Sequence, residues 1–345
     1  MNIETQNTVN GWKLYTLSNQ HHMSVSLLNY GGIITTINVP DRHNNIENVV
    51  LGFKNHADYA QNPNFLGALI GRVAGRIQGA SFTIENQVFD VEANEGTHHL
   101  HGGASGFHQV IWAASPFQTK DTVGVVLTHT SADGEGGYPG TVEMTVTYTL
   151  TNNNELIIDY AATSDKTTAL TLTNHSYFNL TGNVARTIHN HHVTIACDEF
   201  VELDNELIPT GNKLDVTNTP FDFRTGRLIA DGINSTFTQN IVAGHGYDHY
   251  FILNPKQTEA IRVEDEVSGR VITIKTDQPG VVMYTSNNLT EGLELAEGTS
   301  KRYDGVCFET QASPASLHHE DFPTVLLEAH VPYDKQTVFS FSVVK

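Results

Sequence analysis

The 345-residue chain is poor in cysteine, in basic residues and in long apolar runs, and each shortage excludes a class of protein. Two cysteines, Cys197 and Cys307, are too few for the disulfide framework of a small secreted domain. No apolar run reaches the roughly 18 residues that a membrane-spanning helix needs. The N-terminal sequence also lacks the basic and apolar regions of a signal peptide. We therefore expect a cytoplasmic globular protein.

Basic residues are outnumbered two to one by acidic residues. Lysine and arginine number 19 against 38 aspartates and glutamates, which gives a net charge of −19 with histidine neutral. Because this charge repels phosphate groups, we expect no nucleic-acid partner and no membrane surface as a partner. A small neutral ligand suits the composition better, and the sequence leaves a monomer and a homodimer open.

Helical periodicity is nearly absent, with single helical turns predicted only at 57–61 and 227–231. Apolar and polar residues instead alternate over 142–150 and again over 339–343, which is typical of strands with one buried face. Further strands are predicted at 32–39, 82–84, 88–91, 125–128, 156–161, 169–173, 193–196, 261–263, 271–275, 281–284 and 306–309. Strands without crossover helices must pair antiparallel, so we expect an all-β sandwich or barrel, with residues 1–345 as a single domain.

Eighteen histidines raise the question of a metal site. Neighbours such as His98 and His99 point to opposite faces of a strand, whereas His99 and His101 could share a face. No downstream glutamate completes a cupin-like pattern, so we expect no metal ligands and no cofactor.

A glycine-rich segment lies at 71–79, but its glycines are spaced by four rather than as G-x-G-x-x-G, so phosphate binding is not expected. Two arginines in this segment, Arg72 and Arg76, could pair with surface carboxylates or could donate to ligand oxygens. The spacing alone leaves both interpretations open.

Four short segments combine polar, small and aromatic residues at the edges of predicted strands. Aromatic rings next to Asn, Asp and His suit a sugar, because ring faces stack while hydroxyl groups need donors and acceptors. The segments are HHLHGG at 98–103, TNHSYFNL at 173–180, GYDHY at 246–250 and FETQ at 308–311.

Together with 71–77, and in this order, the four segments resemble the aldose 1-epimerase (galactose mutarotase) family. The resemblance runs from about Gly11 to the C-terminus. It implies a large antiparallel β-sandwich, the galactose mutarotase-like supersandwich. It also implies cofactor-free interconversion of the α- and β-anomers of free aldohexoses, galactose and glucose, by ring opening and reclosure.

The resemblance implies catalytic roles for three residues. Glu309 matches the base that takes the proton from the hydroxyl at C1, and His175 matches the acid that protonates the ring oxygen. His101 matches a second histidine near the ring oxygen. Because an unperturbed glutamate is ionised at neutral pH and a carboxylate favours cationic histidine, we expect an ionised Glu309 and a cationic His175. We expect these two groups to lie on opposite edges of the sugar.

The resemblance further implies substrate-binding roles for Arg76 and Asp248, which hold sugar hydroxyls, and for Tyr284 as an aromatic wall. Gly75 departs from the family, which often has Asn before the site arginine. Cys307 lies two residues before Glu309 and should share its face of the strand, as a small apolar filler rather than a nucleophile.

Two alternatives stay open. A hexose-6-phosphate 1-epimerase of the same fold would need a cluster of basic residues, which the composition does not suggest. A non-catalytic sugar-binding protein of the same fold would need no acid and base together, and His175 with Glu309 argues against it.

Overall fold

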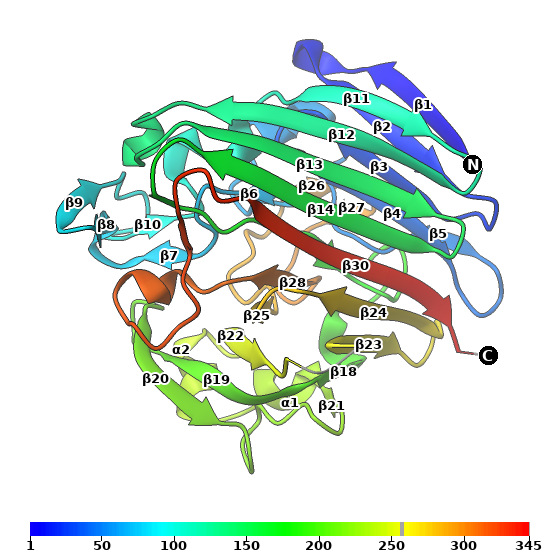
Figure 1. Cartoon of the computed structure of the whole chain (residues 1–345). Helices are drawn as coiled ribbons and strands as arrows, with labels where there is room; N and C mark the ends of the chain where they lie inside the picture. The colour runs from blue at the N-terminus through cyan, green and yellow to red at the C-terminus, as the bar shows by residue number, and fades with distance from the viewer. Residues whose placement is uncertain (256–258, 345) are drawn as a thin grey trace.

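The computed structural model describes residues 1–255 and 259–344, and antiparallel strands dominate it (Figure 1). The all-β prediction is confirmed. Within the described ranges the α-helices are two single turns, α1 (Ile229–Ile233) and α2 (Thr238–Val242). Short 3-10 turns lie at Val9–Gly11, His56–Ala60, Gln78–Ala80, Gly103–Ser105, Phe107–Gln109, Glu135–Gly137, Ile188–Asn190 and Pro314–Leu317. None of the helices in these ranges has the length and apolar character needed to span a bilayer.

The largest sheet has nine strands. In spatial order they are β11 (Ala113–Gln118), β12 (Thr122–Ser131), β13 (Val142–Thr151), β14 (Glu155–Ser164), β30 (Tyr333–Val343), β24 (Arg270–Thr276), β23 (Ile261–Asp265), β18 (His191–Ile195) and β21 (Arg227–Leu228). The alternation over 142–150 falls on β13, where Val142, Met144, Val146, Tyr148 and Leu150 are all buried. The period of two therefore identified the core face of this strand correctly.

Two further sheets pack against the nine-stranded one. One contains β1 (Asn2–Asn7), β2 (Lys13–Ser18), β3 (Ser24–Leu28), β4 (Ile34–Pro40) and β5 (Ile46–Asn48). The other contains, in spatial order, β17 (Tyr177–Phe178), β28 (Val306–Gln311), β25 (Gly280–Tyr284), β22 (Asp248–Leu253), β19 (Cys197–Leu203) and β20 (Pro209–Asp215). A single apolar cluster joins all three sheets, and Phe178 contacts Phe339 within it.

Five short strand pairs complete the fold. They are β6 (Leu69–Ile70) with β16 (Thr173–Asn174), β7 (Arg76–Ile77) with β10 (His99–Leu100), β8 (Ser81–Ile84) with β9 (Gln87–Asp90), β15 (Thr168–Ala169) with β29 (Leu326–Leu327), and β26 (Glu294–Leu295) with β27 (Gly298–Thr299). The first two pairs carry residues of the site described next.

Candidate functional site

One face of the six-stranded sheet lines a cavity of about 290 Å³. Successive strand residues point to opposite sides, so β28 directs Phe308 into the apolar core and Glu309 into the cavity. In the same way β25 buries Met283 and exposes Tyr284 to the cavity, while β22 presents Asp248. The alternation that builds the core thus also builds the floor of the cavity.

The opposite wall comes from the short strand pairs. His175 directly follows β16, and its backbone N–H donates to the carbonyl of Ala68 at 2.8 Å. Arg76 begins β7 and pairs with Leu100 of β10, and His101 follows at the end of β10. The six residues to which the family resemblance assigns a role all line this one cavity: Arg76, His101, His175, Asp248, Tyr284 and Glu309.

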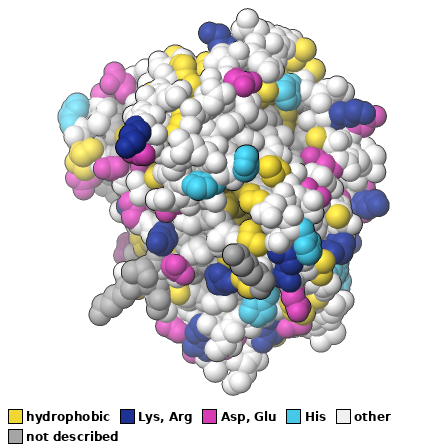
Figure 2. Space-filling view, turned by 90° about the vertical axis from the view of Figure 1, so that its right-hand side faces the viewer, with side chains coloured by type: hydrophobic (Ala, Val, Ile, Leu, Met, Phe, Trp, Pro, Cys, Tyr) yellow, Lys and Arg dark blue, Asp and Glu magenta, His cyan; other side chains and the backbone are white. Residues whose placement is uncertain are grey.

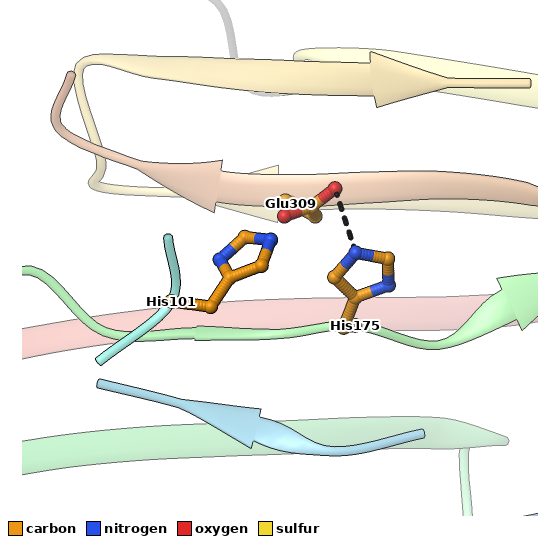
Figure 3. Close-up of side chains that lie close together, drawn as sticks. All are labelled: His101, His175 and Glu309. Carbon is orange, nitrogen blue, oxygen red and sulfur yellow. Dashed lines mark ion pairs between the residues drawn. The ribbon is translucent and has the colours of Figure 1, made fainter. Parts of the chain in front are cut away.

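Glu309 and His175 are in direct reach of each other. Glu309 Oε1 lies 3.5 Å from His175 Nε2, and both side chains are buried (Figure 3). Our expectation that they lie on opposite edges of a sugar is wrong. The hydroxyl and ring oxygens that they would serve are both bonded to C1, so adjacent groups suit the reaction better.

Burial sets the protonation of this pair. Desolvation, with the nearby charge of Asp248, raises the pKa of Glu309 well above its ordinary range, while Arg76 opposes the shift. Desolvation also lowers the pKa of His175 to about 4. A single proton on the pair therefore resides on Glu309, which corrects the expectation of an ionised Glu309 and a cationic His175. The neutral pair and the ionised pair hold the same number of protons and differ only in whether one proton lies on Glu309 or on His175.

His101 is fixed as a hydrogen-bond donor. The backbone N–H of Gly75 donates to His101 Nδ1 at 3.1 Å, so a neutral ring carries its proton on Nε2. The imidazole is neutral because burial, followed by the charges of His175 and Arg76, lowers its pKa well below the ordinary value. His101 therefore offers an N–H group to the cavity.

The ligand atoms of His101, His175 and Glu309 lie within 4.8 Å of one another, a distance at which three groups could hold a metal ion. A metal ligand needs a free lone pair on the coordinating nitrogen. In His101 the Nδ1 lone pair accepts from Gly75, and Nε2 carries the proton. The set therefore suits a hydrogen bond to a ligand oxygen better than a metal.

Arg76 is oriented by two carboxylates. Its Nη2 donates to Glu95 Oε1 at 2.9 Å, and its Nη1 lies 3.6 Å from Asp248 Oδ2. Arg72, by contrast, donates to Ser131 and to backbone carbonyls away from the cavity, where it is fully enclosed. The choice that the sequence left open is thus resolved: Arg76 faces the cavity and Arg72 is structural.

Glu95 and Phe65 are among the cavity residues that were not singled out from the sequence. Glu95 lies in a polar loop without a motif, and only its pairing with Arg76 reveals it. Phe65 packs edge-on against His101, with ring centroids 4.8 Å apart, from a loop that has no periodicity. A single sequence carries no signal for either position.

Comparisons with known proteins give one consistent result. A family model described as aldose 1-epimerase matches residues 13–340. Galactose mutarotase of Bos taurus is 38% identical over 324 residues, or 93% of this chain and 92% of that protein. A maltose epimerase of Levilactobacillus brevis is 35% identical over 332 residues, or 95% of this chain and 94% of that protein. The structure of galactose 1-epimerase from Lactobacillus acidophilus matches with a TM-score of 0.88 at 28% identity, covering 100% of this chain and 99% of that one.

Proposed function

Since the chain belongs to the aldose 1-epimerase family, we propose that it interconverts the α- and β-anomers of free galactose and glucose by acid–base catalysis at Glu309 and His175. The observation that carries these roles is the 3.5 Å approach of Glu309 Oε1 to His175 Nε2 inside the cavity. Opening a cyclic hemiacetal requires an acid and a base at two oxygens of one carbon, and this pair supplies both.

The reaction needs the pair in its ionised form. As the sugar enters, its hydroxyl groups replace part of the solvation lost on burial, so the proton can pass from Glu309 to His175. Glu309 then takes the proton from the C1 hydroxyl while Nε2 of His175 gives its proton to the ring oxygen. Rotation about C1–C2 of the open aldehyde, followed by closure with the roles reversed, yields the other anomer and restores the pair.

The remaining residues position the sugar. The Nε2–H of His101 donates to an oxygen near C1, and Arg76 and Asp248 bind hydroxyl groups farther along the ring. Tyr284 contributes an aromatic wall, and its phenol is held by the backbone N–H of Asn288. None of these steps requires a cofactor.

Polarimetry on freshly dissolved α-galactose tests the assignment. Glu309→Gln removes a proton-transfer group while preserving size, and His175→Asn removes one while keeping a polar side chain, so we expect kcat to fall by about 10²–10⁴-fold in each. Circular dichroism controls for folding. Wild-type rates in either folded variant would contradict the assigned role.

The cavity argues against a phosphorylated substrate. Among the described residues that line it, Arg76 is the sole lysine or arginine, and Glu95 and Asp248 both face its guanidinium group. A dianionic phosphate would therefore meet net negative charge. We expect glucose to be converted far faster than glucose 6-phosphate, and the reverse order would favour the alternative.

A reducing disaccharide is a second candidate substrate. The cavity continues past Asp248 to Leu203 on β19, Leu207 in the following loop and Pro209 on β20. Four inter-strand steps of roughly 4.8 Å separate β28 from β20, or about 19 Å, which is longer than one pyranose. A relative with 35% identity is a maltose epimerase. The apolar side chains at this end suit the face of a second sugar ring.

A panel of glucose disaccharides with different linkages tests the second candidate. We expect at least one to be converted with kcat/KM within about tenfold of glucose. Leu207→Trp should lower that rate more than the glucose rate, because the larger side chain fills the outer cavity. Leu207 already has a positive φ of 61°, so the exchange adds no new backbone strain. Val267→Trp, at a 62% exposed turn position, is the control. Uniformly lower rates for all disaccharides would limit the substrate to monosaccharides.

We further propose that the chain acts in the cytoplasm, as a monomer or homodimer, without nucleic-acid or membrane partners. Both cysteines are free thiols in the interior, which suits a reducing compartment. Light scattering of the purified protein distinguishes the monomer from the homodimer.

A further inference from the structure

Cys307 contacts the side of His175 that faces away from the sugar-binding cavity. Its Sγ lies 3.5 Å from His175 Nδ1, and Cys307 has no exposed surface. Each nitrogen of the imidazole thus has one partner, with Glu309 at Nε2 and Cys307 at Nδ1. The sequence interpretation of Cys307 as an apolar filler on the same face as Glu309 leaves this contact out.

The Cys307 sulfur remains a neutral thiol. Burial, followed by the charges of Glu309 and Asp248, raises its pKa well above the ordinary value. A thiol can donate or accept a weak hydrogen bond, so its partner decides the direction. With Glu309 as the proton donor to Nε2, the neutral ring of His175 carries its own proton on Nδ1, and the sulfur accepts.

We propose that Cys307 is a positioning residue that accepts a hydrogen bond from Nδ1–H of His175 and so leaves Nε2 as the one ring nitrogen that exchanges a proton. In ring opening the Nε2–H bond breaks as the bond from hydrogen to the ring oxygen forms, while the C1 hydroxyl loses its proton to Glu309. The bond between C1 and the ring oxygen breaks in the same step, and its loss leaves a C1 carbonyl and a new hydroxyl group. Nδ1–H stays intact, and closure reverses both transfers. The proposal rests on the roles proposed above for Glu309 and His175.

The opposite tautomer would be unproductive. If Nδ1 of His175 carried no proton, the one proton of the neutral ring would lie on Nε2. Nε2 would then have no free lone pair and could not accept the proton of Glu309. Donation of that Nε2 proton to the sugar would leave an imidazolate, which is far too basic to form at neutral pH. A hydrogen-bond acceptor at Nδ1 therefore acts together with protonated Glu309 at Nε2 to stabilise the tautomer that the reaction needs.

Substitutions at the two cysteines test this role. Cys197 is the matched control, because it is also fully buried and free but packs in a different apolar cluster from Cys307. Loss of a weak hydrogen bond of about 1 kcal/mol corresponds to a loss of roughly fivefold. We expect Cys307→Ala to lower kcat by about that factor with little change in KM. Cys307→Ser, which keeps an acceptor, should restore most of it, and Cys197→Ala should match wild type.

Nitrogen-15 NMR of the His175 ring separates tautomer selection from simple packing. We expect protonation at Nδ1 in the wild type and in Cys307→Ser, and a mixture of tautomers in Cys307→Ala. An unchanged tautomer in Cys307→Ala, or a kcat equal to that of Cys197→Ala, would overturn the proposal. If Glu309→Gln and His175→Asn instead retain wild-type activity, the proposed function itself fails.

Discussion

Glu309 and His175 show how burial, rather than residue type, sets the state of a catalytic group. In water a glutamate loses its proton well before a histidine does, yet here the order of the two pKa values is reversed. The buried pair keeps one proton as a neutral couple and needs only a short transfer to become an acid and a base.

The pH dependence of kcat/KM follows from these shifts. Below a pH of about 4, His175 gains a proton while Glu309 is still protonated, so the pair has no base. Above the raised pKa of Glu309 the pair loses its single proton and has no acid. We therefore expect a broad plateau with an acid limb near pH 4. An acid limb near pH 6.5, the ordinary histidine value, would show that burial does not control the pair.

At the residue scale the sequence could predict which residues form the site better than it could predict their protonation. The order of the four segments placed Glu309, His175 and Asp248 at one site without any structural information. It could not reveal the protonation of the pair, because desolvation depends on what the fold packs above it. It also could not reveal Glu95, whose role comes from a contact with Arg76 across 19 positions of the chain.

At the scale of the strands and loops, the site depends on a glycine with a positive φ in the loop before β7. Gly75 precedes Arg76 with a φ of +87°, and its N–H orients His101. A β-carbon at Gly75 would lie 3.0 Å from Cγ of Pro314. The family's frequent Asn is absent here, and this close approach favours glycine in this chain.

Gly75→Ala should therefore destabilise the fold and disturb the site. The left-handed backbone alone costs about 1–2 kcal/mol for a residue with a β-carbon. Gly79→Ala is the control, because Gly79 also has a positive φ but has open space around it. We expect urea unfolding to show a larger loss for Gly75→Ala, and polarimetry to show a lower rate in this variant alone. Equal losses of unfolding free energy in the two variants would mean that Pro314 moves aside without a measurable cost and would contradict this prediction.

Strand prediction succeeded for interior strands with clear alternation and missed strands both at sheet edges and inside the sheets. The interior strands β2, β3, β19 and β22 lie outside the predicted ranges. The interior strand β13 has clear alternation, and the structure confirms it. The edge strands β1 (Asn2–Asn7), β11 (Ala113–Gln118) and β20 (Pro209–Asp215) were not predicted. Edge strands are rich in polar residues and tolerate proline, as at Pro116, so they lack the periodic signal. The single helical turns expected near 57–61 and 227–231 are present as His56–Ala60 and α1.

Across the whole molecule, one apolar cluster joins the nine-stranded sheet to both smaller sheets, so the cavity floor is built on a shared core. The side chains of β28 illustrate the arrangement, with Phe308 packed in the shared core and Glu309 facing the cavity. The surface is mixed in charge on the face shown in Figure 2, where basic side chains lie among acidic and uncharged ones. That the whole chain forms a single domain remains a prediction.

The measurement that tests the account most directly is the polarimetric rate of the double variant Glu309→Gln/His175→Asn beside the two single variants. Groups that act as one proton-transfer unit are strongly non-additive, because removing either partner already disables the other. We predict that the double variant is no slower than the slower single variant. A double variant whose loss is the product of the two single losses would show that Glu309 and His175 act independently, and would contradict the account.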